Sequence, residues 1–202
     1  MKSDHRRLLP ELYRPSRSSF SSVDVPPLHF LIADGSGDPN TSPEYAGTVE
    51  ALFSVAFAAK FIVKRRSGGT DFSVMPLEGL WWGDDMERFS VERKGEWRWR
   101  MMIMQPAPVD AGVIAEAVAS VRRKKEPSAL ARLRFERFEE GRCVQMVHCG
   151  PYADEAENIA RLHGHIRSLG LRLRGKHHEI YLNDPRRTAP ARLRTILRQP
   201  ID

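Results

Sequence analysis

Cysteine is scarce in this sequence: Cys143 and Cys149 are the only two in 202 residues. They form neither a Cys-x-x-Cys pair nor a cluster with metal-ligand spacing, which argues against a disulfide framework and against a structural zinc site. His177 and His178 are adjacent, but a metal would need a third ligand at suitable spacing, and the sequence offers none. We therefore expect no metal and no other cofactor, and a reducing cytoplasm as the compartment.

Long hydrophobic runs are also missing. The first 30 residues hold no apolar stretch of signal-peptide length, and no later stretch is expected to reach the roughly 18 apolar residues that span a membrane. Hydrophobic residues make up 41% of the chain and charged residues 29%, which is typical of a globular protein. We expect a soluble intracellular protein with no membrane partner.

Acidic residues are in the minority, since 32 Lys and Arg face 26 Asp and Glu and give a formal net charge of +6. A basic balance suggests nucleic acid as a partner. However, several basic runs fall where a helix should end, and a cation there gains about 0.3 to 1 kcal/mol from the helix dipole. No helix-turn-helix, zinc-finger or ribonucleoprotein aromatic motif accompanies the charge. We expect no dedicated nucleic-acid-binding module.

The first half of the chain reads as strand, helix, strand, strand. Residues 1–23 are polar and are expected to form an arm over the surface, ahead of a domain at 24–202. A strand is predicted at 28–33, and a helix begins at Pro43 with Ser42 as its cap. The predicted buried face of this helix carries apolar residues at a spacing of three and four: Val49, Leu52, Phe53, Ala56 and Phe57.

Two further strands complete this first module, which spans about 24–105. The segments "FSVMPLEGLWW" and "EWRWRMMIMQP" are predicted to be strands joined by a polar hairpin region at 83–95. In the second of them, Trp97 and Trp99 alternate with arginines, as in a half-buried strand, so core packing is their expected role.

The second half repeats the order over about 131–202. The segment 134–150 reads as a hairpin or a strand, and a helix with Gly170 as its C-cap follows. One stripe of that helix is predicted to contain Ile159, Leu162, His163 and Ile166. The segments "KHHEIYLND" and "LRTILRQPI" supply two more strands, and a connecting helix at about 110–125, capped by Asp110, separates the halves.

Two equivalent strands each carry a carboxylate followed by bulky apolar residues, Glu78 in one half and Glu179 in the other. A strand-helix-strand-strand unit cannot bury its sheet alone, so two should pack about a pseudo-two-fold axis. The sequence therefore predicts an α+β fold of two tandem modules with antiparallel sheets and a ligand cleft between them. We expect both glutamates to face that cleft.

Six segments together resemble the GyrI-like small-molecule-binding family: "SPEYAGTVEALFSVAFAAKF", "VMPLEGLWW", "WRMMIMQP", "ALARLRFERFEEG", "HCGPYADE" and "LRGKHHEIYLNDPRRTAPARLRTILRQPI". The resemblance extends from about Val25 to the C-terminus. It implies two strand-helix-strand-strand modules with an aromatic cleft that holds planar, often cationic or electrophilic molecules around a buried glutamate. Relatives of this architecture serve as effector-binding domains of multidrug-responsive regulators, and some resemble hydrolases that open the cyclopropane of DNA-alkylating natural products.

The resemblance places the central acid on Glu179 and pocket aromatics on Trp81 and Trp82. The two tryptophans are adjacent and face opposite ways on a strand, so at most one is expected in the cleft. Tyr181 lies two positions after Glu179, on the same side of an ideal strand, and the two are expected to pair. Tyr152 is either a further cleft residue or a staple before the helix.

Glu78 has two readings as well. It is a candidate ligand-binding residue, or a structural acid neutralised by Arg98 or Arg100 on the next strand. A carboxylate taken out of water is suited to pair with a cationic ligand or to act as a general acid or base near neutral pH. Tyr181 would assist Glu179 in such proton transfer.

Three functions follow from these residues. The favoured one is a module that binds planar aromatic, cationic or electrophilic small molecules for sequestration or detoxification. The first alternative is a hydrolase in which Glu179 and Tyr181 open a cyclopropane. The second alternative is a protein-interaction module, such as a topoisomerase modulator.

Overall fold

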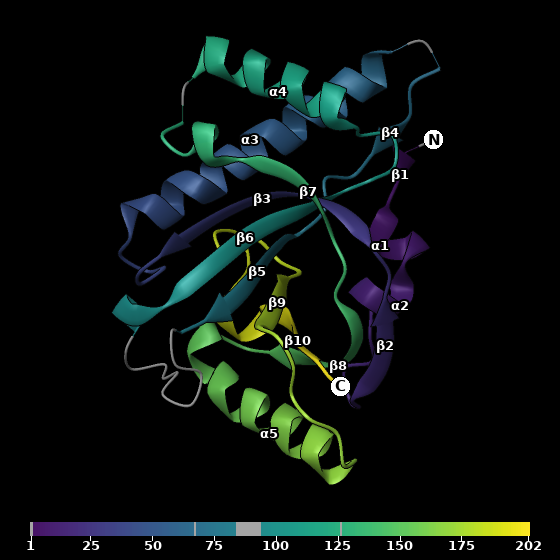
Figure 1. Cartoon of the computed structure of the whole chain (residues 1–202), viewed down its shortest axis with the longest axis vertical. Helices are drawn as coiled ribbons and strands as arrows, with labels where there is room; N and C mark the ends of the chain where they lie inside the picture. Colours follow the sequence, from purple (N-terminus) through teal and green to yellow (C-terminus); the bar gives the residue numbers. More distant parts are fainter. Residues whose placement is uncertain (1, 67, 84–93, 126) are drawn as a thin grey trace.

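An antiparallel sheet of eight strands dominates the part of the chain that the computed structural model describes, residues 2–66, 68–83, 94–125 and 127–202 (Figure 1). In chain order the strands are β2 (Ser21–Val25), β3 (Leu28–Ser36), β5 (Leu77–Trp82), β6 (Arg98–Gln105), β7 (Arg134–Phe138), β8 (Gly141–Cys149), β9 (His177–Tyr181) and β10 (Arg194–Pro200). Across the sheet they lie in the order β2-β8-β10-β9-β5-β6-β3-β7.

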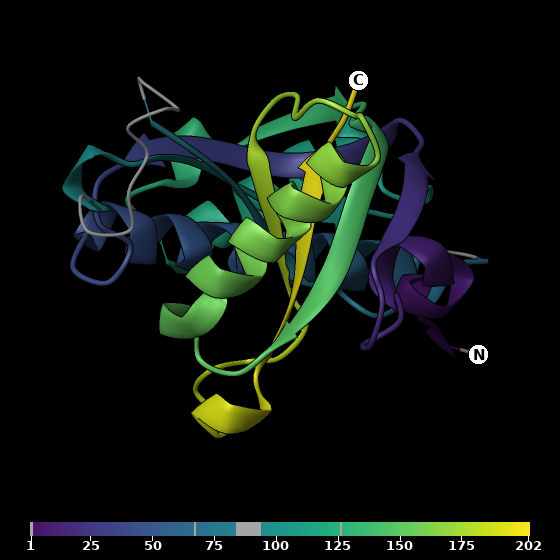
Figure 2. The same ribbon diagram turned by 90° about the horizontal axis from the view of Figure 1, so that it is seen from below.

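Helices pack against the sheet near both of its ends, with α3 and α4 at the top of Figure 1 and α5 at the bottom (Figures 1 and 2). They are α1 (His5–Leu8), α2 (Pro10–Tyr13), α3 (Pro43–Arg65), α4 (Ala111–Lys124) and α5 (Glu155–Ser168), with short 3-10 turns η2 (Lys94–Glu96), η3 (Leu130–Arg132), η4 (Tyr152–Asp154) and η5 (Pro190–Arg192). Helix α3 packs on β3 and β6, and α4 packs on α3. Helix α5 packs on β8 and β10.

The strand order confirms two tandem modules of the same topology. Strands β3, β5 and β6 with α3 form the first module, and β8, β9 and β10 with α5 form the second. The second strand of each module in chain order is β5 or β9. These two strands lie side by side at the junction of the modules and pair antiparallel. A two-fold relation between the modules follows from this symmetrical order.

The outer strands are exchanged between the modules. β2 precedes β3 in the chain but pairs with β8, and β7 precedes β8 but pairs with β3. The hairpin reading of residues 134–150 is therefore wrong, because its two strands lie at opposite ends of the sheet. Each module therefore pairs with the strand that precedes the other module in the chain.

Helix α3 begins as predicted, with Pro43 in its first turn and the Ser42 hydroxyl accepting a hydrogen bond from the Tyr45 amide at 3.2 Å. Its buried side differs from the prediction, because Phe57 is 47% exposed whereas Val55 and Ala59 are fully buried. In the second module Leu162 and Ile166 are buried as expected.

By length and composition, α3 could also cross a membrane, since its most apolar 18 residues have a mean hydropathy of 1.6. The expectation that no segment reaches this limit is wrong. In the fold, 44% of that window is buried, and the helix packs on the sheet and on α4. Core helices of soluble proteins share this composition, so it does not by itself indicate a membrane.

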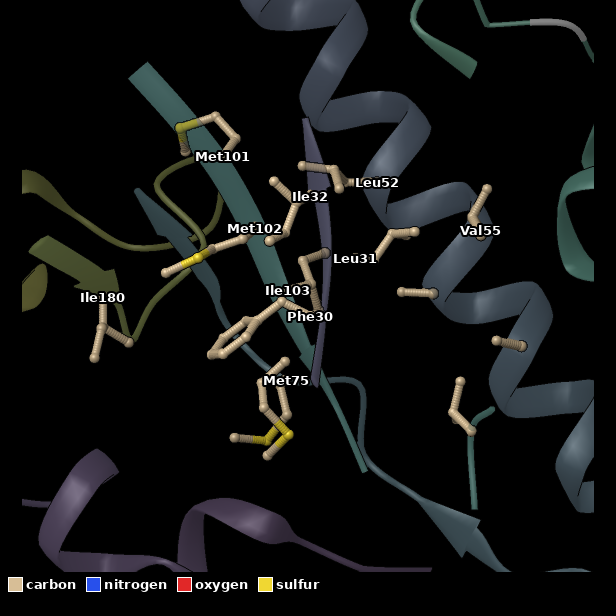
Figure 3. Close-up of a cluster of buried hydrophobic side chains, with 14 of the residues drawn as sticks. Phe30, Leu31, Ile32, Leu52, Val55, Met75, Met101, Met102, Ile103 and Ile180 are labelled. Atoms are coloured by element: carbon tan, nitrogen blue, oxygen red, sulfur yellow. The ribbon is translucent and has the colours of Figure 1, made fainter. Parts of the chain in front are cut away.

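The core occupies both faces of the sheet: Leu52 and Val55 of α3 pack on one face, and Phe30, Met102 and Ile180 lie on the other (Figure 3). Met101 and Ile103 of β6 and Leu52 of α3 are completely buried. Fully burying one such side chain contributes about 1.5 to 3 kcal/mol. This packing stabilises the central strands, which carry the residues at the junction of the two modules.

The N-terminal residues are part of the fold and do not form the surface arm that their polarity suggested. β1 (Lys2–Ser3) pairs in parallel with β4 (Asp71–Phe72), and β2 is an edge strand of the large sheet. Leu12 and Tyr13 of α2 are 4% and 2% exposed. A boundary after residue 23 would cut β2. Most of the predicted hairpin region 83–95 lies outside the described residues.

Candidate functional site

The candidate site is at the junction of the two modules, on the face of the sheet that carries Glu179. In the β5–β9 ladder Gly79 lies opposite Glu179, Trp81 opposite His177, and Leu77 opposite Tyr181. Directly opposed residues of an antiparallel pair project to the same face. Trp81, Glu179 and Tyr181 therefore share one face of the sheet.

Gly79 makes room for the tryptophan. A Cβ atom on Gly79 would lie 2.8 Å from Nε1 of Trp81, closer than a side chain tolerates, and 3.2 Å from the end of Met101. Because Gly79 has no side chain, the Trp81 indole can lie over the strand toward β9. The glycine between two apolar residues in "LEGLWW" thus has a specific steric purpose.

Trp81, Tyr181 and Glu179 form a chain of hydrogen bonds. The Trp81 indole N–H donates to the Tyr181 hydroxyl at 3.1 Å, and that hydroxyl donates to Oε2 of Glu179 at 2.6 Å. The expected pairing of Tyr181 with Glu179 is confirmed. The Glu179 side chain is 13% exposed, and Nε2 of His177 lies 3.4 Å from its other oxygen. One carboxylate oxygen thus accepts a hydrogen bond from Tyr181, and the other lies near His177.

Aromatic rings from three further elements surround this chain. Tyr45, in the first turn of α3, lies 6.1 Å from Trp81 and 5.4 Å from Trp99, between ring centroids. Trp97 meets Trp81 edge-on at 5.4 Å, and Tyr152 of η4 meets Tyr181 at 5.5 Å. Tyr152 is 39% exposed, so the group reaches solvent.

Glu155, in the first turn of α5, is the one carboxylate of this site that sequence reasoning missed. It is 5% exposed, and burial together with the negative charge of Glu179 raises its pKa to about 9, against a smaller opposing effect of Thr195. In the sequence it resembles an ordinary acid at a helix N-terminus. Only the fold shows that it is buried near a second carboxylate.

We call the following residues the Glu179 cluster: Tyr45, Trp81, Trp99, Tyr152, Glu155, Glu179 and Tyr181. Burial, then the charges of Glu155 and Glu179, raise the pKa of Tyr152 to about 12. Burial and the Glu179 charge also raise the pKa values of Tyr45 and Tyr181. In the part of the chain that the structure describes, no Lys or Arg forms an ion pair with Glu155 or Glu179. The negative charge of Glu179 is therefore not paired with a Lys or Arg of the described residues.

Glu78 does not belong to this cluster. It lies opposite Ile180 in the β5–β9 ladder and so projects to the other face of the sheet. There it is completely buried, accepts a 2.8 Å hydrogen bond from the Tyr13 hydroxyl, and lies 3.0 Å from Nε2 of His178. The expectation that Glu78 and Glu179 share a cleft is wrong. Gly79 lies opposite Glu179 and shares its face, and Glu78, the neighbour of Gly79 on β5, projects to the other face.

Neither arginine proposed as the partner of Glu78 forms an ion pair with it among the described contacts. Arg100 binds Asp34 at 2.6 Å instead. Trp82 is likewise on the opposite face from Trp81, where the Lys176 ammonium lies 3.3 Å from its ring centroid. Of the two adjacent tryptophans, Trp81 is the one in the cluster.

A buried ionic network occupies the face behind the cluster. His178 lies between Glu78 and Glu140, with Nδ1 2.9 Å from Glu140, and Arg198 donates to Glu140 at 3.2 Å. Burial alone would lower the pKa of His178, but Glu140 and Glu78 raise it to about 9. Burial alone would raise the pKa of Glu140, but His178 and Arg198 lower it to about 2. Arg198 also donates to the Leu12 carbonyl at 2.7 Å, so the network fastens α2 to the sheet.

The arrangement as a whole, aromatic rings around an acid at the junction of two modules, is that of a small-molecule-binding domain. The chain belongs to the GyrI-like small molecule binding domain family, which matches residues 19–202.

Solved structures agree with this assignment. An uncharacterized conserved protein from Listeria innocua is 36% identical, with a TM-score of 0.92, and the similarity covers 100% of both chains. A hydrolase from Listeria innocua is also 36% identical over 100% of both chains, with a TM-score of 0.86. The EcmrR C-terminal domain, 10% identical with a TM-score of 0.56, shares the fold over 91% of this chain and 97% of its own. No curated protein gave a significant match.

Proposed function

We propose that the Glu179 cluster binds planar aromatic molecules that carry a positive charge. The observation that carries this proposal is the Glu179 carboxylate, 13% exposed among aromatic rings, with no Lys or Arg ion pair among the described residues. A largely buried carboxylate without a Lys or Arg partner is costly, so a ligand that brings a cation to it is favoured.

The rings add to this selectivity. A cation within about 6 Å of a tryptophan or tyrosine face gains about 0.5 to 2 kcal/mol, and a flat ligand gains further from stacking. Tyr45 and Tyr152 come from the N-terminal ends of α3 and the α5 region, one from each module. A ligand that touches both would be held between the modules. Sequestration of such molecules is the biological role that this chemistry supports.

Adjacent tryptophans offer a matched test of location. A cationic aromatic dye should quench wild-type tryptophan fluorescence on binding. Trp81→Phe should remove a cluster ring and the hydrogen bond to Tyr181, and it should weaken binding about tenfold. Trp82→Phe removes a tryptophan from the opposite face and should leave affinity within about twofold. Equal losses in the two variants would contradict the proposed site.

Hydrolysis is the second candidate, favoured by the pair of carboxylates. The pKa of about 9 keeps Glu155 protonated at neutral pH, beside the Glu179 carboxylate that shifts it. A protonated acid and a nearby second carboxylate can divide general-acid and general-base work. A protein 36% identical to this one is described as a hydrolase, which supports the same reading.

The reaction would be addition of water to a cyclopropane conjugated with a dienone. Glu179, oriented by Tyr181, accepts a proton from water as the water oxygen bonds to a ring carbon. The strained carbon–carbon bond breaks, its electron pair moves toward the carbonyl, and Glu155 supplies the proton taken up there. The substrate gains one water, and proton return from Glu179 to Glu155 restores the site.

Mass spectrometry separates the two functions. The purified protein is incubated with a spirocyclopropane-bearing alkylating compound and, separately, with cationic aromatic dyes. A gain of one water on the compound, lost in Glu179→Gln and kept in Trp82→Phe, would establish hydrolysis. If the dyes bind and every compound is recovered unchanged, the result would support the binding function and contradict hydrolysis.

A further inference from the structure

A cavity of about 620 Å³ lies between the N-terminal segment and the connection from β9 to β10, and none of its lining residues belongs to the Glu179 cluster. That connection ends in the η5 turn, which projects at the bottom of Figure 2. The polar side chains that line the cavity include Arg17, Asn183, Arg187, Thr188, Arg192 and Arg194. A smaller cavity of about 200 Å³ adjoins it, shares Arg17 and Arg194, and adds Arg14. Among the residues that the structure describes, no carboxylate lines either cavity.

These arginines are largely without acidic partners. Among the residues that the structure describes, Arg14, Arg17, Arg192 and Arg194 form no ion pair, and Arg187 approaches Asp184 only at 3.9 Å. Arg17 and Arg194 lie outside any helix, so a helix dipole does not account for their positions. Arg14, Arg17, Arg187 and Arg192 are exposed and Arg194 is half-buried. Guanidinium groups repel one another, so an anion that lies between these five is favoured.

The walls of the cavity are held in place by the fold. Arg194 is the first residue of β10, and its side chain donates to Oδ1 of Asn183 at 3.3 Å. The Gly150 amide donates to the Leu193 carbonyl at 3.0 Å, and the Leu182 amide donates to the Arg194 carbonyl at 3.0 Å. Both ends of the connection are therefore fixed to strands before any ligand arrives.

We propose that this cavity binds a small anion with several phosphate groups. Guanidinium is the side chain best suited to phosphate oxygens, because its donors can bind two of them at once. The volume lies within the range of small-molecule sites, about 300 to 1,000 Å³. The five arginines line one connected space, which differs from the extended track that a nucleic-acid strand needs. Asn183 and Thr188 supply further hydrogen-bond donors at the wall.

The site is independent of the proposed function of the Glu179 cluster. The cluster presents carboxylates and attracts cations, whereas this cavity presents arginines and attracts anions. Failure of either proposal therefore leaves the other untouched.

Calorimetry with inorganic triphosphate tests the proposal at fixed ionic strength. Wild-type protein should bind triphosphate more tightly than orthophosphate or citrate, which separates phosphate-chain recognition from simple attraction of negative charge. Arg17→Gln with Arg194→Gln should weaken binding at least about tenfold. Arg167→Gln with Arg172→Gln removes the same two charges from exposed sites outside both cavities and should change affinity less than about twofold. Equal weakening in both variants would overturn the proposal.

The cysteines report where the anion sits. Cys149 is exposed and lines this cavity, whereas Cys143 is buried and is the internal reference. Triphosphate should slow modification of Cys149 by a neutral thiol reagent relative to chloride of the same ionic strength. An unchanged rate at saturating triphosphate would place the anion elsewhere and overturn the assignment. If the double variant does not fold, Arg192→Gln provides the same comparison from the exposed η5 turn.

A single-stranded oligonucleotide is the competing polyanion. Triphosphate should protect Cys149 at a lower phosphate concentration than the oligonucleotide does. If the oligonucleotide protects better per phosphate, the cavity is part of a nucleic-acid surface and the small-anion proposal is wrong.

Discussion

The Tyr181 hydroxyl donates a 2.6 Å hydrogen bond to Glu179, two positions earlier on the same strand, and accepts one from Trp81 on the neighbouring strand. These two hydrogen bonds fix the Trp81 indole N–H and the Tyr181 hydroxyl in position. Glu179 is held in one orientation by a group from its own strand, and that group is held by the other module. The relation joins the two halves of the molecule at the acid we consider central.

Tyr181→Phe tests this chain of hydrogen bonds. The change leaves the Trp81 indole N–H without its acceptor and Glu179 without its donor. Unpaired buried groups cost about 1 to 3 kcal/mol, which for a chain of this size lowers the melting temperature by roughly 2 to 10 °C. Differential scanning calorimetry measures the shift. An unchanged melting temperature would show that the two hydrogen bonds contribute nothing net to folding.

Gly79→Ala tests the steric role of the glycine. The new Cβ would lie 2.8 Å from Nε1 of Trp81, so the indole must move away from Tyr181. We expect a loss of about 1 to 3 kcal/mol in the free energy of unfolding, with weaker binding of cationic dyes. Gly95→Ala is the control, since a Cβ there meets no atom of the described residues within 4 Å. Urea unfolding of the two variants should differ; similar stabilities would contradict the account.

The buried network predicts a loss of stability at alkaline pH. The folded pKa of His178, about 9, is above its unfolded value near 6.5, so its contribution is complete below pH 6.5 and is lost as pH rises toward 9. Glu155, with a pKa raised to about 9, adds a fall of the same sign from about pH 4.5. Urea unfolding in a Glu155→Gln background isolates the histidine. Constant stability between pH 6.5 and 9 would be the contrary result.

The same network predicts a loss of stability in acid. The folded pKa of Glu140, about 2, is below its unfolded value near 4.5. Its contribution is therefore present above pH 4.5 and is lost as pH falls toward 2. Sodium chloride should protect little, because the pair is buried away from screening ions. Unfolding monitored by circular dichroism between pH 5 and 2 measures the fall, and a flat profile would argue against a charged Glu140.

Glu155 makes cation binding depend on pH. Its pKa of about 9 keeps it neutral at pH 7, and a bound cation favours the ionised form. Affinity for a cationic dye should therefore rise from pH 7 toward 9, with protons released on binding. In Glu155→Gln the rise should disappear. Calorimetry in buffers of different ionisation enthalpy counts the protons, and zero release from the wild type would remove Glu155 from the site.

Local sequence patterns were sufficient to predict the two modules and the contribution of β9 to the site. The spacing of Glu179 and Tyr181 predicted their contact, because residues two apart on a strand share a face. The cap at Ser42 and the positive φ of Gly170 also follow from short-range chemistry. These features depend on residues close together in the chain.

Features that depend on strand register could not be predicted. The β5–β9 ladder pairs Gly79 with Glu179 and sends Glu78 to the opposite face, a choice that one residue of slip would reverse. Nor does the sequence show that Tyr13 is the donor to Glu78, because 65 positions separate them. The burial of Glu155 likewise depends on where α5 packs.

Charge discrimination by Glu179 tests the central claim most directly. We would measure by calorimetry the affinities of a cationic aromatic dye and of a neutral dye of the same shape, for the wild type and for Glu179→Gln. The account predicts that the wild type prefers the cation about tenfold or more and that the variant loses this preference while it still binds the neutral dye. Equal weakening for both dyes, with the preference intact, would contradict a charge-pairing role for Glu179.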